Sequence, residues 1–219
     1  MSIKVKICGN TSLEDARVAA EAGADMLGFI FYEPSRRNIA PEKAGEIVAT
    51  LRAELGDAAP VMVGVFVDEP MARVRELRES LGLDLAQLHG SEPPVEMRVL
   101  GSFAFKAIRP QNRGDAEALV ATYGDVLPQH PDAPDFLLDA YHPWMIGGTG
   151  YKSDWHSGKT LATRFKVMLA GGLSVENVAE AIHVVQPWGV DVASGVEASK
   201  GVKDHERVRA FIREAKRAP

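Results

Sequence analysis

Short apolar runs recur eight times along this chain, and they constrain its fold more than any other feature. Several are apolar almost throughout, as in Val61–Val67, rather than alternating between apolar and polar residues. Continuous apolar strands are typical of parallel sheets, which are covered on both faces. The eight predicted strands are Ile3–Cys8, Asp25–Phe31, Val61–Val67, Leu85–Leu88, Phe103–Ile108, Phe136–Asp139, Val167–Ala170 and Val190–Val192.

Helical patterns lie between these runs. Thr11 and Glu14 have the spacing of a capping box, and Ser174 is placed to cap a helix that carries Val175 and Val178. Weaker patterns predict further helices near Glu92–Leu100, Asp115–Tyr123 and Lys159–Thr163.

A strand followed by a helix, repeated eight times without a break in composition, predicts the α/β class and a closed (β/α)8 barrel. We expect one domain over residues 1–219. An open doubly wound sheet is the structural alternative. A glycine fingerprint after the first strand would favour it, but the segment Cys8–Thr11 holds a single glycine.

Charge and cysteine content restrict the partners and the compartment. The formal net charge is −5 and no basic stripe is visible, which argues against a nucleic-acid partner. The single cysteine, Cys8, excludes an intrachain disulfide and suits a reducing compartment. The apolar runs are far shorter than the ~20 residues of a membrane helix, and Met1–Asn10 lacks a signal-peptide core. We expect a cytoplasmic protein without a membrane partner, either a monomer or a homodimer.

A barrel places its catalytic groups at the carboxyl ends of its strands. Cys8 ends the first strand and would serve as a general base if its surroundings favour the thiolate; inert packing is the alternative. Asp139 ends the sixth strand and would serve as a general acid if burial raises its pKa; a cap or an ion pair is the alternative. Arg37 follows the second strand and is suited to a bidentate grip on a carboxylate, unless it is simply an exposed arginine.

Glycines after the seventh and eighth strands predict a phosphate site. Gly171 and Gly172 follow the seventh strand, and Ser194 and Gly195 follow the eighth. Barrels often bind phosphate with these two loops, because glycine lets backbone N–H groups approach an anion closely. The alternative is that these glycines only form turns. The histidines have no metal-ligand spacing, so we expect no metal ion.

Two connections are long. Residues 124–135 are rich in proline and aspartate and precede a strand, so we place them on the bottom face. Residues 140–158 follow the sixth strand, contain Gly147–Gly150, and form a candidate lid on the top face. A disordered connection is the alternative for this second segment.

The strand-end motifs together resemble one enzyme family. They are KICG at Lys6–Gly9, Gly28–Tyr32 followed by Ser35–Arg37, QLHG at Gln87–Gly90, Leu137–Asp139, GGTG at Gly147–Gly150, AGGL at Ala170–Leu173 and DVASGVE at Asp191–Glu197. In this order and spacing the chain resembles phosphoribosylanthranilate isomerase of tryptophan biosynthesis, over essentially its whole length.

The resemblance implies an Amadori rearrangement of N-(5-phosphoribosyl)anthranilate, a small phosphosugar, without a metal or cofactor. Cys8 would take the proton from carbon 2 of the ribose, and Asp139 would protonate the ring oxygen. Arg37, rather than Arg36, would hold the anthranilate carboxylate. Gly172 with the Ser194–Gly195 loop would hold the phosphate. The further expected substrate-binding residues are Gln87, His89, Gly148, Gly171 and Asp191.

Two other functions remain open from the sequence. The histidine-pathway isomerase performs the same chemistry on another phosphoribosyl substrate, but that family has an aspartate where this chain has Cys8. A barrel without activity that only binds a metabolite or a partner is the second alternative. The chain also departs from the family at Ser153, where an aromatic residue is usual.

Overall fold

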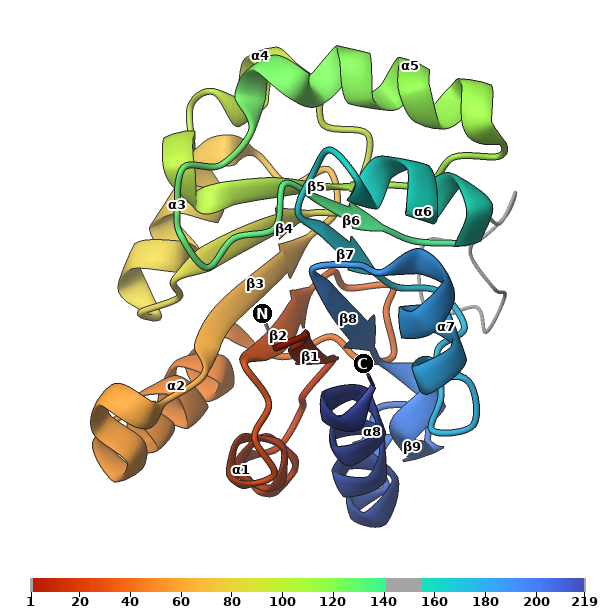
Figure 1. Ribbon diagram of the computed structural model, residues 1–219. Helices are drawn as coiled ribbons and strands as arrows, with labels where there is room; N and C mark the ends of the chain where they lie inside the picture. Colours follow the sequence, from red (N-terminus) through yellow and green to blue (C-terminus); the bar gives the residue numbers. More distant parts are fainter. Residues whose placement is uncertain (1, 141–154, 219) are drawn as a thin grey trace.

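The computed structural model describes residues 2–140 and 155–218, and its eight parallel strands close into a barrel (Figure 1). Each strand pairs with the next along the chain, and β1 also pairs with β8. The strands are β1 Lys4–Cys8, β2 Met26–Phe31, β3 Val61–Phe66, β4 Leu85–Leu88, β5 Ala104–Ile108, β6 Phe136–Leu138, β7 Val167–Leu169 and β8 Gly189–Val192. The predicted (β/α)8 barrel is confirmed, and every strand end lies within one residue of its prediction.

Helices surround the barrel on the outside (Figure 1). They are α1 Leu13–Glu21, α2 Pro41–Leu55, α3 Met71–Ser80, α4 Pro94–Met97, α5 Arg113–Tyr123, α6 Trp155–Ala162, α7 Val178–Val185 and α8 His205–Arg217. No helix among the residues described is long and apolar enough to cross a membrane.

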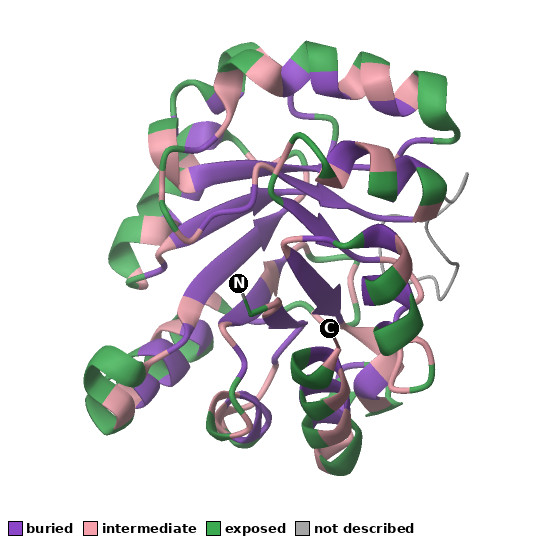
Figure 2. Cartoon of the chain, viewed as in Figure 1, coloured by how far each residue is buried: buried purple, intermediate pink, exposed green. Residues whose placement is uncertain are grey.

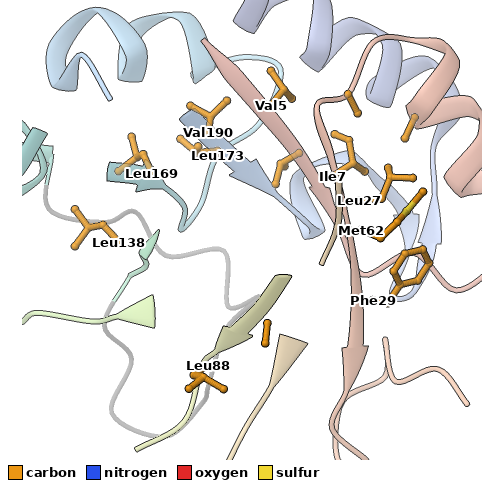
Figure 3. Packing of buried hydrophobic residues seen from close by; sticks show 14 of the residues in the cluster. Val5, Ile7, Leu27, Phe29, Met62, Leu88, Leu138, Leu169, Leu173 and Val190 are labelled. Carbon is orange, nitrogen blue, oxygen red and sulfur yellow. The ribbon is translucent and has the colours of Figure 1, made fainter. Parts of the chain in front are cut away.

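Side chains of each strand alternate between the two faces of the barrel wall. Val5 and Ile7 of β1 belong to the large apolar cluster between the strands and the helices (Figure 3). Inward-facing residues such as Phe105 and Met168 form a second, smaller cluster inside the barrel. The strands are therefore buried almost throughout (Figure 2), which explains why their sequences are continuously apolar.

Two helices differ in extent from their prediction. α4 covers only four residues, because Pro93 and Pro94 follow Glu92 directly. A residue that precedes proline is disfavoured in helical conformation, so the helix begins only at Pro94. α6 begins at Trp155, earlier than the sequence pattern indicated.

Two predicted helix caps are wrong. Thr11 Oγ1 donates to the carbonyl of Gly201 at 2.7 Å, and Ser12 caps α1 instead by accepting from the backbone N–H of Asp15 at 3.1 Å. Ser174 precedes a turn rather than a helix, because its N–H donates to Asn177 Oδ1 at 2.8 Å. The helix begins three residues later, after Asn177. In both places a hydrogen bond between a neighbouring polar side chain and the backbone accompanies the observed start of the helix.

The structure places one of the two long connections. The segment 124–135 leads from α5 into the start of β6, on the bottom face as predicted, and its Ala133 packs into the inner cluster. Residues 141–154, which include Gly148, Ser153 and most of the candidate lid, lie outside the described residues.

A small antiparallel hairpin follows β8. It consists of β9 (Glu197–Ser199) and β10 (Val202–Lys203), and it lies between β8 and α8 in the chain. The hairpin returns Lys203 to the carboxyl end of β1, where its Nζ donates to the carbonyl of Cys8 at 2.6 Å. The hairpin thereby brings the charged side chains of Glu197 and Lys203 to the end of the barrel that carries the predicted site.

Candidate active site

A cavity of about 470 Å³ opens at the carboxyl ends of the strands. It brings together most of the side chains and loops singled out from the sequence. The predicted site residues that line it are Cys8, Arg37, Gln87, His89, Asp139, Gly171, Gly172, Asp191 and Ser194. Gly195 is not among the lining residues, and Gly148 lies outside the described residues.

Cys8 ends β1 with its side chain buried at the edge of the cavity. Gly28 of the neighbouring strand β2 makes room for it, because a Cβ at Gly28 would lie only 2.7 Å from Cys8 Sγ. Any side chain at position 28 would therefore push the sulfur away from its place. Gly28, the first residue of the motif Gly28–Tyr32, therefore has a steric function beside the thiol.

Burial raises the pKa of the Cys8 thiol, and the carboxylate of Asp191 raises it further. The ammonium groups of Lys6 and Lys203 act in the opposite direction without overcoming the burial. These surroundings therefore favour the thiol, which is contrary to the condition under which Cys8 was expected to serve as a base. The group becomes a base only when its proton is lost, and it is then a stronger base than an exposed cysteine.

Lys6 lies on β1, two residues before Cys8, and its side chain points into the barrel. Its Nζ is 2.8 Å from Asp191 Oδ1 on β8, and the Lys6 side chain is fully buried. Burial lowers the pKa of Lys6, but the charge of Asp191 and the interaction with Cys8 more than offset this, so the pKa ends above its ordinary value. The barrel thus holds a fixed ammonium beside the thiol.

Asp139 follows β6 and takes part in a chain of three polar side chains. Gln87 Nε2 lies 2.7 Å from His89 Nδ1, and His89 Nε2 lies 3.0 Å from Asp139 Oδ2. If the amide of Gln87 donates to Nδ1, the ring proton is on Nε2 and His89 donates to the carboxylate. The other carboxylate oxygen, Oδ1, accepts from the backbone N–H of Ala140 at 2.8 Å. These contacts fix the orientation of Asp139 at the cavity wall.

Arg37 lines the cavity and forms a bidentate ion pair with Glu197 of β9. Its Nε and Nη2 lie 2.6 Å and 2.8 Å from the two carboxylate oxygens. The hydrogen bonds to Glu197 hold the pKa of Arg37 above its ordinary value. A guanidinium has five N–H donors, so about three remain for a ligand after this pair has formed. The pair orients the guanidinium without using up its donors.

Lys203 connects the ends of two strands. Its Nζ donates to the carbonyls of Cys8 at 2.6 Å and Ala193 at 3.2 Å, and lies 3.5 Å from Glu197. Burial lowers the pKa of Lys203 below its ordinary value, and the charge of Glu197 offsets part of this. Lys203 therefore holds β1, β8 and the hairpin in one arrangement around the cavity.

The two glycine loops follow the neighbouring strands β7 and β8. Gly171 and Gly172 have φ values of +87° and +66°, which residues with a Cβ rarely adopt. A Cβ at Gly195 would lie 1.9 Å from the carbonyl oxygen of Leu173. Gly195 therefore allows the two loops to touch, while Gly172 and Ser194 face the cavity.

A buried ion pair supports the loop that carries His89. Lys106 Nζ of β5 donates to Glu92 Oε2 at 2.6 Å and to the carbonyl of Gly90 at 2.7 Å. Glu92 also accepts from the backbone N–H groups of Gly90 and Asp68. Burial raises the pKa of Glu92, but Lys106 and the hydrogen bonds more than offset it, so the carboxylate is the favoured form.

We expect Lys106→Met to lower the free energy of unfolding by about 3–5 kcal/mol, because it leaves Glu92 buried without its counter-ion. Urea denaturation of the wild type and the variant measures the difference. The exposed pair Arg17–Glu54 provides the control, and Arg17→Met should change stability by less than about 1 kcal/mol. If the two substitutions lowered the free energy of unfolding equally, the supporting role of the buried Lys106–Glu92 pair would be contradicted.

Sequence reasoning missed three charged residues of this site: Lys6, Glu197 and Lys203. Lys6 and Glu197 lie within the KICG and DVASGVE motifs, so the motifs themselves carried a signal. Lys203 had none, because its contact with Cys8 spans 195 positions of the chain and depends on the hairpin. Within residues 2–140 and 155–218, no group of three or more histidine, cysteine or acidic side chains is placed to hold a metal ion.

The chain matches one family of known proteins over nearly its whole length. A family model described as PRAI, N-(5'phosphoribosyl)anthranilate (PRA) isomerase, matches residues 5–214. The N-(5'-phosphoribosyl)anthranilate isomerase of Geobacter sp. (strain M21) is 44% identical over 214 residues, which cover 98% of each chain.

Solved structures give the same result. Monomers generated from a dimeric phosphoribosylanthranilate isomerase of Thermotoga maritima match with a TM-score of 0.82 and 37% identity, over 98% of both chains. An isomerase in complex with reduced 1-(o-carboxyphenylamino)-1-deoxyribulose 5-phosphate matches with a TM-score of 0.81 and 37% identity, again over 98% of both chains.

Proposed function

Because the chain belongs to the N-(5'-phosphoribosyl)anthranilate isomerase family, we propose that Cys8, Asp139 and Arg37 act together on the substrate of that family. The protein is an aldose–ketose isomerase of tryptophan biosynthesis. Its reaction is the Amadori rearrangement of N-(5-phosphoribosyl)anthranilate to 1-(2-carboxyphenylamino)-1-deoxyribulose 5-phosphate. The histidine-pathway alternative is set aside, because the family and its relatives are named for the anthranilate substrate.

The rearrangement needs an acid at one point of the sugar and a base at another. Asp139 gives a proton to the ring oxygen, and the furanose opens as the nitrogen lone pair forms a Schiff base with carbon 1. Cys8 then takes the proton from carbon 2, which yields an enolamine that tautomerises to the ketone. Each such proton transfer contributes about 10²–10⁴ in rate. Atoms are conserved overall, as an isomerisation requires.

The contacts of Asp139 support the acid role. After Asp139 has given up its proton, the carboxylate accepts from His89 and from the N–H of Ala140. Hydrogen bonds donated to the charged form stabilise the state that follows proton transfer. In this proposal His89 and Gln87 orient the acid, in addition to bordering the substrate.

Two anion-binding groups hold the ends of the substrate. Arg37 binds the anthranilate carboxylate with the N–H donors that Glu197 leaves available. The backbone of Gly171, Gly172 and Ser194 binds the phosphate, since glycines in this conformation expose their N–H groups. Fixing both ends places the reacting carbons between the acid and the base.

The observation that carries these assignments is that Cys8, Asp139, Arg37 and the glycine loops all border one cavity of about 470 Å³. A turnover assay with N-(5-phosphoribosyl)anthranilate, beside the phosphoribosyl substrate of the histidine-pathway isomerase, tests the function directly. We expect rapid conversion of the first and little of the second. No conversion of the first substrate would overturn the proposal.

Arg37→Ala should raise KM by about tenfold or more with a smaller effect on kcat. Hydrogen bonds to a charged group contribute about 1.5–3 kcal/mol, and each 1.4 kcal/mol is about tenfold in affinity. Steady-state kinetics measures both parameters, and Arg36→Ala, also at the cavity, is the comparison. An effect on kcat alone, or a larger KM effect from Arg36, would contradict the assignment.

The remaining expectations are proposals about the whole molecule. We infer one catalytic domain over residues 1–219, supported by a barrel that closes from β1 to β8. The biosynthetic family and the single cysteine support a cytoplasmic location, which cell fractionation tests. A relative from Thermotoga maritima is described as dimeric, and sedimentation analysis would decide between a monomer and a homodimer for this chain.

A further inference from the structure

We propose that Lys6 is a positioning residue whose buried ammonium stabilises the thiolate of Cys8 during the isomerisation. The inference rests on the proposed role of Cys8 as the base, and it assigns the group that makes this base available. Lys6 itself neither touches the reacting carbons nor lines the cavity. It acts through the sulfur.

The first support is position. Lys6 and Cys8 are two residues apart on β1, so their side chains point to the same face of the strand, into the barrel. The Lys6 side chain is fully buried, and its Nζ lies 2.8 Å from Asp191 Oδ1. A lysine is almost never buried in this way unless it is paired. The barrel therefore holds this charge at a fixed place below the sulfur.

The second support is the balance of charges around the sulfur. Four charged groups act on or respond to Cys8: Lys6 on β1, Asp191 on β8, Lys203 on β10 and Arg37 after β2. Arg37 and Lys203 both share Glu197 as a counter-ion, and Lys203 also donates to two carbonyls. Among these cations, Lys6 has the strongest effect on the pKa of Cys8.

The third support is the chemical need for such a group. Burial makes the thiolate unfavourable, yet the proposed reaction requires it to accept the proton from carbon 2. A fixed cation beside the sulfur lowers the free energy of the thiolate without giving up a proton of its own. The proton moves from carbon to sulfur, and Lys6 remains an ammonium paired with Asp191 throughout.

The chain offers a direct test, because Cys8 is its only cysteine. Thiolate absorbance and the rate of alkylation by iodoacetamide therefore report on this one group, with the Cys8→Ala variant as the blank. In Lys6→Met we expect the Cys8 titration to move to higher pH by about one unit, which lowers the alkylation rate below the pKa by about tenfold. The alkaline rise of kcat/KM should shift in the same direction.

Lys4→Met is the matched control. Lys4 lies on the same strand and is also paired with an aspartate, Asp25, but it lies at the far end of β1. Its substitution should leave the Cys8 titration unchanged. An unchanged titration in Lys6→Met would overturn the proposal, because removing a cation that stabilises the thiolate must raise the pKa of the thiol.

Lys6→Met leaves Asp191 buried without its counter-ion, so this variant is open to misfolding. The double variant Lys6→Met/Asp191→Asn removes both charges and keeps the test valid. The titration should still move to higher pH, by less than in the single variant, since Asp191 itself raises the pKa. A titration at or below that of the wild type would overturn the proposal. If Cys8→Ala retains turnover, the base assignment fails, while the titration still decides whether Lys6 controls the sulfur.

Discussion

Asp139→Asn is expected to lower kcat by about 10²–10⁴ while KM stays within a few-fold of the wild type. Asparagine has nearly the shape of aspartate and keeps an oxygen that His89 can donate to. It has no acidic proton to give to the ring oxygen. The substitution should therefore remove ring opening from the catalysed path and leave binding largely intact, because the carboxylate and phosphate ends of the substrate are held elsewhere. Steady-state kinetics measures the two parameters separately.

Asp84→Asn is the control for this experiment. Asp84 immediately precedes β4, and there it accepts from the backbone N–H of Met62 at 2.7 Å. This position is at the opposite end of the barrel from the cavity, so the substitution should leave kcat unchanged. Near-normal turnover in Asp139→Asn would remove the acid assignment. A collapse of activity in both variants would point to lost folding, which circular dichroism detects.

Cys8→Ala is expected to cause a loss of kcat in the same range, because alanine cannot accept the proton from carbon 2. Cys8→Ala loses the abstraction of the proton from carbon 2, whereas Asp139→Asn loses ring opening. A kinetic isotope effect distinguishes these two steps. With deuterium at carbon 2, proton abstraction is slowed in any enzyme where this step limits turnover. We expect a larger isotope effect in Cys8→Ser, whose hydroxyl is a poorer base, than in the wild type.

The buried thiol also predicts a pH dependence for this second experiment. A group whose pKa is raised is protonated at neutral pH, so the thiolate fraction and kcat/KM should rise together on the alkaline side. Cys8→Ala should lose this rise along with most of its activity. Unchanged turnover in Cys8→Ala would return the residue to a packing role beside Gly28.

Much of the fold was predictable from local pattern. Strands such as Val61–Phe66 are buried on both faces, so their sequences are apolar without interruption and stand out in any reading of the chain. The weak points were short helices. α4 begins late because of Pro93 and Pro94, and α7 begins after Asn177, whose side chain accepts from the N–H of Ser174 in a turn before the helix. Those outcomes depend on competition between neighbours that periodicity does not register.

The candidate site, like the fold, was predictable from the sequence only in part. Residues at strand ends, such as Cys8 and Asp139, were predictable because a parallel barrel gathers the carboxyl ends of its strands at one rim. The interactions that set their chemistry were not. Arg37 appeared free to bind a carboxylate, yet the structure pairs it with Glu197, 160 positions further along the chain. Whether the surroundings of Cys8 favour the thiolate was open from the sequence, and in the structure burial opposes its ionisation.

The sequence by itself determined the barrel, the order of its strands and the residues at the carboxyl ends of those strands, because these follow from local apolar runs and from the geometry of parallel strands. Only the tertiary structure decided which charges surround the sulfur. Lys6 meets Asp191 across 185 positions, and Lys203 reaches Cys8 across 195. Such contacts depend on how the barrel closes β8 against β1, and the electrostatic effect of a buried charge depends on the distances that this closure sets.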